Sequence, residues 1–446
     1  MGSAGDGGAG AGAVWRPPPG KRGVFLHRRL VEIGGRGVRV RRLGGSRAGE
    51  MRITRFLRNE RVSVAEMLAS AAARTAGRVA GRHVLAIQDT TSVRERPGEG
   101  RSLMLHPTIA VDGENGALLG LVDAALLARA GGQKQTRKSR DFADKESRRW
   151  LDGTCAAARL LEAGAASVTV VADREGDIYE EFALRPEGVD LVIRAAQDRK
   201  LADGTLLFQC TAGLAEAGRR RVTLPAAPGR PARQALLALR WCEVALARPK
   251  SRSAEAAAQL PGEVRLTLVE AIELDPPPGV APAHWRLLTT HAVADFAAAE
   301  RIVDIYRQRW TIEQLFRVLK TKGFDIEAAR IVEGGPFEKL VTATLIAAVT
   351  VQQLVRDRDG TAKRPLDDAL DPADRPILEA VSRSLEGKTQ RQKNPHPADT
   401  LAFAAWVFAR LGGWTGYYGK PGPVVILQGL LRFNDIKHGY EILADV

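Results

Sequence analysis

The sequence predicts an α/β fold built on a mixed β-sheet, with a β-rich insertion and a helical C-terminal region. Three observations lead to this prediction. Short apolar runs at Val84–Ile87, Thr108–Val111 and Ala117–Val122 follow one another, and Glu114-Asn115-Gly116 joins the last two with a strong hairpin signal. Helical and strand-like segments then alternate. Helical periodicity returns after Ala297 and continues toward the C-terminus.

The segment after the hairpin alternates between helix and strand. Residues 144–163 have the apolar spacing of an amphipathic helix, and a β-branched strand follows at 168–171. A short helix at 178–184 and a strand at 190–194 come next. A three-strand meander followed by alternating helix and strand is the order expected of a ribonuclease-H-like fold.

Residues 196–290 interrupt the predicted core, which comprises residues 81–195 and 291–357. They are rich in Gly and Pro and contain short segments in which apolar and polar residues alternate. We therefore predict a β-rich insertion. Residues 358–446 are mainly helical in pattern, with breaks at Pro and Gly.

Two helices are predicted after the insertion, over residues 297–322 and 337–356. The second contains the longest uncharged apolar stretch, Leu340–Val355, which also holds several Thr and Gln residues. That stretch is shorter than the roughly 20 residues of a membrane span. We therefore expect a buried helix and no membrane partner.

The positive charge of the chain is concentrated at its start. Lys and Arg number 66 and Asp and Glu number 52, a net charge of +14, and residues 1–60 hold nine of these charges (13 basic against 4 acidic residues). This excess favours a polyanionic partner such as nucleic acid. Residues 1–50 are rich in Gly and Arg, so we expect a flexible basic leader, and residues 51–80 are expected to be helical.

An acidic residue stands at the carboxyl end of two predicted strands. The run Val84–Gln88 leads into Asp89, and the run Val168–Ala172 leads into Asp173. An aspartate after a strand can also be a turn residue or a helix N-cap. Its recurrence after two strands of one predicted sheet favours a functional site instead, because α/β proteins place their sites at this edge. Paired carboxylates of this kind suit Mg²⁺ or Mn²⁺.

A third acidic residue lies on the predicted helix 302–320. At about 100° per residue, five side chains spaced 3, 4, 4 and 3 residues apart share one face of that helix: Tyr306, Arg309, Glu313, Arg317 and Lys320. Such a face can be a solvated surface with ion pairs between successive turns. It can also bring a third carboxylate to the two aspartates, with cations left to hold phosphates.

Three sequence blocks carry a resemblance to a known family. They are AIQDTTSV around Asp89, VVADREGDIYEEF around Asp173, and DIYRQRWTIEQLFRVLKTKG around Glu313. The third has Tyr, two residues, Arg, three residues, Glu, six residues, then Lys. The sequence resembles the DDE transposases of bacterial cut-and-paste insertion sequences, in the insertion-sequence-four family that includes the transposon-five transposase. Weaker likeness, such as DKESRRWLDG near residue 150, extends it over nearly everything after residue 50.

The resemblance implies roles for individual residues. It implies a ribonuclease-H-like core in which Asp89, Asp173 and Glu313 are catalytic and bind two Mg²⁺, with Mn²⁺ as a substitute. It also implies that Trp285 in the insertion receives a flipped base. The DNA-binding side chains that we expect, in addition to Trp285, are Tyr306, Arg309, Lys320, Arg317 and Arg194.

The function implied is that of a transposase. It would nick transposon ends, form and open hairpins, and join the ends to target DNA, as a paired-end complex of two subunits acting in the cytoplasm at the bacterial nucleoid. Members of the family generally open with a compact helical domain that reads the ends of the element, where this chain has the Gly/Arg-rich stretch before Met51. The resemblance implies that residues 51–80 are a helical remnant of this N-terminal DNA-binding domain. The alternatives are a structure-specific nuclease of the same fold and an inactive remnant that only binds DNA. A two-carboxylate glycosidase would explain neither the basic helix face nor the charge.

Overall fold

The structure is a computed structural model of the chain. It describes residues 21–96, 101–129, 146–224, 231–250, 258–320, 323–331, 333–417 and 419–444. Two compact units make up the chain. The first comprises residues 1–75, 115–121 and 314–446, and the second comprises residues 76–114 and 122–313. The residues from 314 to 357, which we predicted to be part of the core, therefore cluster with the N-terminal and C-terminal helices.

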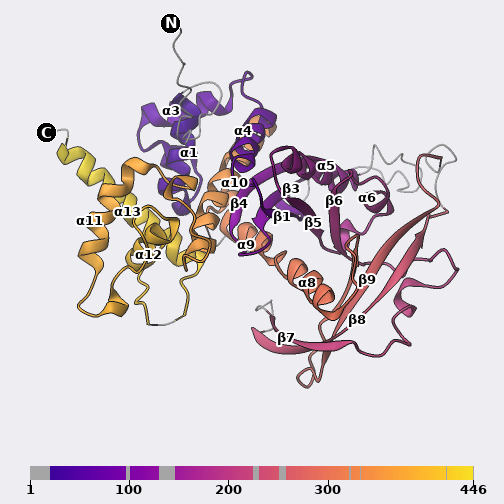
Figure 1. The fold of residues 1–446 in the computed structure, drawn as a ribbon. Helices are drawn as coiled ribbons and strands as arrows, with labels where there is room; N and C mark the ends of the chain where they lie inside the picture. Colours follow the sequence, from indigo (N-terminus) through magenta and orange to yellow (C-terminus); the bar gives the residue numbers. More distant parts are fainter. Residues whose placement is uncertain are drawn as a thin grey trace, which may run out of the picture. The chain divides into compact units, whose positions relative to one another are not determined.

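The second unit holds most of the strands (Figure 1). Its β-strands are β1 (His83–Gln88), β2 (Thr91–Arg96), β3 (Arg101–Asp112), β4 (Leu118–Arg129, shared with the first unit), β5 (Ser167–Ala172), β6 (Val189–Arg194), β7 (Gly218–Leu224), β8 (Arg233–Ala247), β9 (Glu263–Leu274) and β10 (His284–Thr289). Its helices are α5 (Arg148–Glu162), α6 (Tyr179–Ala183), α8 (Phe296–Arg307) and the start of α9 (Trp310–Leu319).

The first unit is helical. Its helices are α1 (Lys21–Ile33), α2 (Val40–Gly44), α3 (Arg47–Leu57), α4 (Val64–Ala76), α10 (Gly334–Asp357), α11 (Arg375–Leu385), α12 (Leu401–Leu411) and α13 (Pro423–Ala444). The C-terminal region is thus mainly helical, as predicted.

One mixed sheet organises the second unit. The strand order is β2-β3-β1-β5-β6-β10-β9-β8-β7, and β4 pairs with β3. Strands β1, β5 and β6 run parallel to one another, whereas β3 is antiparallel to β1 and β10 is antiparallel to β6. The mixed α/β fold predicted from the sequence is confirmed. Because β1 and β5 are parallel neighbours, their carboxyl ends lie at the same edge.

Helices cover both faces of the central strands. Along β5, Val168 and Val170 point to one face and Thr169 to the other, because side chains alternate along a strand. Helix α5 packs against β1, β3 and β5, and a side chain added at Gly153 of α5 would collide with Gln88 of β1. On the opposite face, Thr169 hydrogen-bonds to His83 and His291, and α8 packs against β5, β6 and β10.

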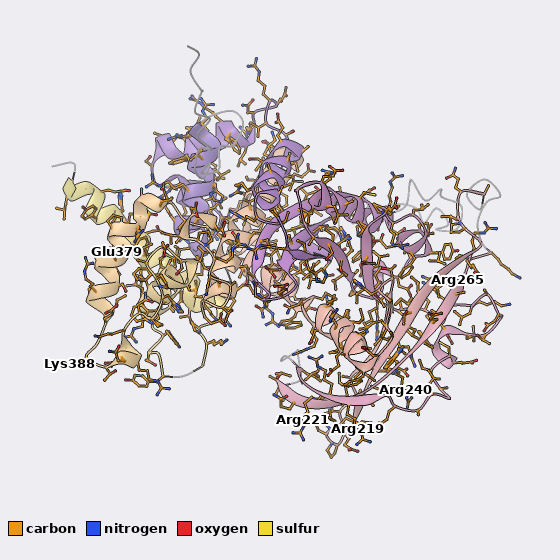
Figure 2. The ribbon with its side chains drawn as sticks, in the orientation of Figure 1. Arg219, Arg221, Arg240, Arg265, Glu379 and Lys388 are labelled. Carbon is orange, nitrogen blue, oxygen red and sulfur yellow. The ribbon has the colours of Figure 1, made fainter. Side chains whose placement is uncertain are left out.

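The insertion is β-rich, as expected, and it extends the core sheet rather than forming a separate one. Strands β8 and β9 pair along most of their length, and β10 joins β9 to β6. Strand β7 is the outer edge, where Arg219 and Arg221 are exposed (Figure 2). Arg219 pairs with Glu216, and Arg220 forms a two-point contact with Asp304 of α8.

The prediction of one continuous helix over residues 297–322 is wrong, because the helix is interrupted after Arg307. The chain forms two helices, α8 and α9, with a turn at Gln308 and Arg309. Neither Gly nor Pro marks this break in the sequence. The Arg309 side chain instead reaches Asp89, so a tertiary contact accompanies the break. Tyr306 is also buried, at 5% exposure, and does not lie on a solvated face.

The flexible leader predicted for residues 1–50 is wrong from residue 21 onward, where α1, α2 and α3 form; residues 1–20 lie outside the described part of the chain. Leu26 and Leu30 of α1 are fully buried. The glycines that suggested flexibility permit close packing, since a Cβ on Gly44 or Gly49 would collide with backbone atoms where α2 meets α3.

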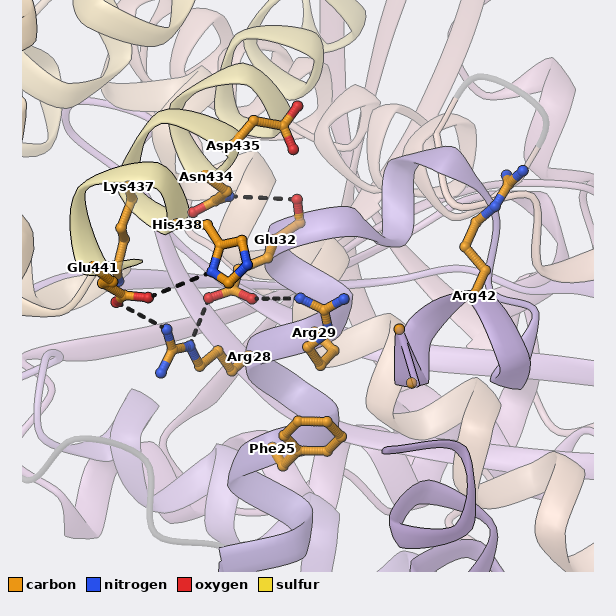
Figure 3. Close-up of a pocket in the computed structure, with 12 residues that line it drawn as sticks. Phe25, Arg28, Arg29, Glu32, Arg42, Asn434, Asp435, Lys437, His438 and Glu441 are labelled. Atoms are coloured by element: carbon orange, nitrogen blue, oxygen red, sulfur yellow. Dashed lines mark hydrogen bonds and ion pairs between the residues drawn. The ribbon is translucent and has the colours of Figure 1, made fainter. Parts of the chain in front are cut away.

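Helix α1 also packs against the C-terminal helix of the same unit. The two helices line a cavity of about 940 Å³ (Figure 3). Within it, Arg28 of α1 pairs with both Glu32 and Glu441, and Asn434 of α13 donates a hydrogen bond to the Glu32 carbonyl. These contacts fix the start of the described chain to its end.

Helix α10 is the core of the first unit. It is long and apolar enough to cross a membrane, but 89% of its most apolar window is buried inside the protein. Two of its side chains hold the tip of the β3–β4 hairpin, where Gln353 donates to the Leu119 carbonyl and Arg356 to the Gly116 carbonyl. The helix therefore packs as the buried core helix that the sequence predicts.

Candidate active site

Asp89 and Asp173 occupy equivalent places after two parallel strands. In the pairing of β1 with β5, Ile87 lies opposite Val171, and each aspartate follows two residues later. A local hydrogen bond orients each carboxylate: the Thr90 amide donates to Asp89 at 2.8 Å, and the Glu175 amide donates to Asp173 at 2.9 Å. Asp173 thereby caps a short 3-10 helix, so the structural role considered for it from the sequence is also present.

Arg309 connects the third acidic residue to the first. Its guanidinium donates to the Asp89 carboxylate at 2.9 Å and also pairs with Glu313, one turn further along the chain. Only 14% of the Asp89 side chain and 16% of the Arg309 side chain are exposed. Two acidic residues more than two hundred positions apart in sequence therefore share one buried cation.

The three acidic residues interact electrostatically. Burial, followed by the negative charge of Asp173, raises the pKa of Asp89 from 3.8 to about 7, and Glu313 adds to this rise. Arg309 opposes it. A cation placed near the Asp89 carboxyl would therefore favour its ionised form and lower its pKa.

Three further residues of the same unit are connected to this cluster through Tyr306, which Arg309 and Asp173 influence electrostatically. The Trp285 ring on β10 meets the Tyr306 ring edge-on, with 5.6 Å between centroids. Arg194, at the end of β6, donates to the His284 carbonyl at 2.9 Å and hydrogen-bonds to Tyr306. Burial raises the pKa of Tyr306, while Arg309 and Arg194 act to lower it. The Arg309 amide also donates to the Tyr306 carbonyl at 3.0 Å, so Tyr306, Arg309, Arg194 and Trp285 form one contact chain.

Two of the residues expected to bind DNA belong to the other compact unit. Arg317 and Lys320 lie in the second half of α9 and just after it. Arg317 is exposed, and Lys320 pairs with Glu327 at 3.1 Å. They are therefore outside the contact chain that links Trp285 to Asp89.

Within the described ranges, no three His, Cys, Asp or Glu side chains are arranged as they stand to hold a metal ion. At the Asp89 cluster the positive charge comes from Arg309, whose guanidinium contacts two of the three acidic groups. The guanidinium therefore offsets part of the negative charge of Asp89 and Glu313.

Sequence reasoning missed Arg149, which lies at the start of α5 and contacts the turns after both strands. The block DKESRRWLDG contained it, but nothing in that block showed which cation faces inward. It also left Asp177 unassigned. The Asp177 side chain is fully buried and pairs with Arg199 at 2.8 Å, so its role is structural.

We predict that Asp89 makes stability depend on pH. Its pKa is higher in the folded state than its ordinary value of 3.8, so the stabilisation from the protonated form is complete below about pH 4 and is lost as the pH rises to about 7. In urea unfolding with EDTA, the wild type should lose more free energy of unfolding between pH 5 and pH 8 than Asp89→Asn does. Parallel pH profiles for the two proteins would contradict this.

Comparison with known proteins bears on the same region. A family model described as "Transposase DDE domain" matches residues 81–350, which is more than half of the chain. A solved structure described as the cryo-EM structure of the piggyBac transposase synaptic complex with hairpin DNA aligns with 64% of this chain and 48% of that chain, at 10% identity and a TM-score of 0.31. The chain thus spans about half the length of that structure's chain.

Proposed function

Because the chain belongs to the family of transposase DDE domains, we propose that it cuts and joins DNA strands with Asp89, Asp173 and Glu313 as its catalytic residues. The observation that carries the proposal is the convergence of these residues. Asp89 and Asp173 end neighbouring parallel strands, and Arg309 links Asp89 to Glu313. A structural surface ion pair would account for one such contact but not for an Asp89 carboxyl whose pKa is raised by burial and by the charges of both other acids.

The fold we propose is ribonuclease-H-like. The order β4-β3-β1-β5-β6, with β3 antiparallel and β5 and β6 parallel to β1, supports this assignment. The insertion between β6 and α8 and the spacing of Tyr306, Arg309, Glu313 and Lys320 support the more specific likeness to insertion-sequence-four transposases.

Divalent cations fit the chemistry of the donor set. Asp89, Asp173 and Glu313 offer hard oxygen ligands of the kind that Mg²⁺ and Mn²⁺ prefer, and Arg309 already marks a place for positive charge among them. When bound, such ions supply an activated attacking oxygen and a charge that stabilises the leaving oxygen. The protein's own part is to hold the three carboxylates together and to aim the scissile phosphate at them.

We propose that DNA lies along the contact chain from Trp285 to Arg309. Arg194 and Arg309 are cations that suit phosphate oxygens, and Tyr306 supports Trp285 from its edge. A base stacked on Trp285 would gain about 1 to 3 kcal/mol, enough to hold it while the strand bends into a hairpin. Arg317 and Lys320 are proposed as further phosphate contacts. The working form that we propose is a two-subunit complex on paired transposon ends, at the nucleoid in the cytoplasm.

The test of this function is the reaction itself. The full chain is incubated with Mg²⁺ or Mn²⁺ and a duplex bearing the inverted repeat that flanks its gene, and the products are separated on denaturing gels. We expect nicked, hairpin and target-joined products, and Trp285→Ala should reduce the hairpin far more than the nick. Cleavage without joining would indicate a nuclease instead, and binding without metal-dependent cleavage would indicate an inactive remnant.

A further inference from the structure

Arg149 contacts the turns that carry two of the three proposed catalytic residues. Its side chain is only 8% exposed. Its Nε donates to the Thr90 hydroxyl at 3.1 Å, and its terminal nitrogen Nη2 donates to the Glu175 carboxylate at 3.1 Å. The other terminal nitrogen donates to the Glu146 carbonyl at 2.7 Å. All three nitrogens of this guanidinium therefore donate to other groups of the protein.

Each of the first two contacts lies next to an aspartate. The Thr90 amide donates to Asp89, and the Glu175 amide donates to Asp173. Arg149 thus ties together two turns that come from different strands and are more than eighty residues apart in sequence. A planar guanidinium holds its donors in fixed directions toward both turns, whereas a Lys ammonium is a compact charge on a flexible stem and would hold them less rigidly.

A buried hydrogen-bond chain orients the Thr90 hydroxyl. It runs from Thr90 to His106 at 2.9 Å, from His106 to Gln88 at 3.0 Å, and from Gln88 to Thr154 at 3.0 Å. Thr154 then donates to Glu181. Burial lowers the pKa of His106 to about 3, so its ring is neutral.

The direction of every hydrogen bond in this chain can be deduced by starting from its end at Gln88 and Thr154. The Gln88 amide nitrogen donates to Thr154, so its oxygen accepts from the Nε2–H of His106. The Nδ1 of the neutral ring must then accept, and the Thr90 hydroxyl donates to it. This leaves the Thr90 oxygen as an acceptor for Arg149. The whole chain points one way, from the guanidinium to the buried Glu181.

We propose that Arg149 is a positioning residue that fixes the Asp89 and Asp173 turns so that their carboxylates can bind divalent ions together. The proposal rests on the function proposed above and adds a residue to it. Arg149 reaches the reacting groups only through Thr90 and Glu175. Partners of this kind, which orient metal ligands without binding the metal, typically change metal affinity or activity by about 10- to 100-fold when they are lost.

The experiment measures Mn²⁺ binding by electron paramagnetic resonance with the full chain, with and without the inverted-repeat duplex. Arg149→Gln should weaken Mn²⁺ binding by about tenfold or more, and Arg149→Lys should not restore it. The direction of the change in Mn²⁺ affinity separates a positioning role from a simple charge effect, because removing a nearby positive charge would by itself strengthen cation binding. Unchanged or tighter binding in Arg149→Gln would overturn the proposal.

Two further variants complete the test. Arg148→Gln is the matched control, because Arg148 is the neighbouring arginine on α5, is half exposed and forms an ion pair at 3.3 Å with Asp152, one turn along the same helix. It should bind Mn²⁺ as the wild type does. An Arg149→Gln protein without a cooperative thermal transition would be misfolded, and Thr90→Val then tests the proposal in its place. This substitution keeps the charge and the size of the side chain but removes the hydroxyl that accepts from Arg149. Weaker binding in Thr90→Val supports the proposal, and unchanged binding overturns it. A wild type that neither binds Mn²⁺ nor cuts DNA would instead refute the proposed function.

Discussion

Replacing Glu313 with Gln is expected to lower the rate of metal-dependent strand cleavage by roughly a thousandfold or more, because a metal-bound carboxylate supports several kcal/mol of transition-state stabilisation. The amide keeps the shape of the side chain and an oxygen that can accept from Arg309. The loss of cleavage rate therefore measures the contribution of the negative charge alone. Binding of the end duplex should persist, since the change removes a charge that repels phosphate. The measurement is single-turnover cleavage on denaturing gels, with duplex binding followed by gel shift.

Asp89→Asn and Asp173→Asn should show the same separation of cleavage from binding. The control is Glu300→Gln on the preceding helix, because Glu300 faces Arg220 rather than the acidic cluster. It should cleave at the wild-type rate. Normal cleavage by any one of the three cluster variants would remove that residue from the active site.

Asp177→Ala is expected to cost roughly 3 to 5 kcal/mol of unfolding free energy, because it leaves a buried arginine without its partner. The Asp177 side chain is fully buried. It accepts hydrogen bonds from the Ala196 amide at 2.8 Å, the Gln197 amide at 3.2 Å and the Arg199 side chain at 2.8 Å. These contacts hold the chain where it leaves β6 for the insertion.

Urea unfolding followed by circular dichroism measures this loss. Glu187→Ala serves as the reference, because Glu187 is an exposed acid in the same unit, and its substitution should change stability by less than about 0.5 kcal/mol. An Asp177→Ala protein as stable as this reference would show that the buried pair is not needed. Asp173 and Asp177 thus lie in one sequence block, but we expect substitution of Asp173 to abolish cleavage and substitution of Asp177 to lower the free energy of unfolding.

The parts of the site that could be predicted depend on strand geometry. Apolar runs that end in an acid identify buried strands, and parallel neighbours bring such ends together, so Asp89 and Asp173 could be placed at one edge from sequence alone. The edge strand β2, Thr91–Arg96, was not predicted. Three of its six residues are charged, and its pairing with β3 leaves no apolar pattern to detect.

Other features depend on tertiary contacts that leave no local pattern. The turn at Gln308 and Arg309 contains no helix breaker, and the helices at the start of the chain lie in a Gly-rich sequence. The roles of Gly44 and Gly49 become clear only where two helices touch. Arg149 stands beside Arg148 in the sequence, and only the fold shows which of the two is buried.

Strand β10 pairs with β6 on one side and β9 on the other, and this double pairing restricts how the chain can be shortened or recombined. The insertion cannot be exchanged as a cassette between related proteins at residues 196 and 290, because such a cut removes a strand on which the central sheet depends. A chimera would have to retain His284–Thr289 and place its junctions in the outer β7–β8 ribbon, where they would have to preserve the pairing of β8 with β9 and the contact of Arg220 with Asp304 of α8.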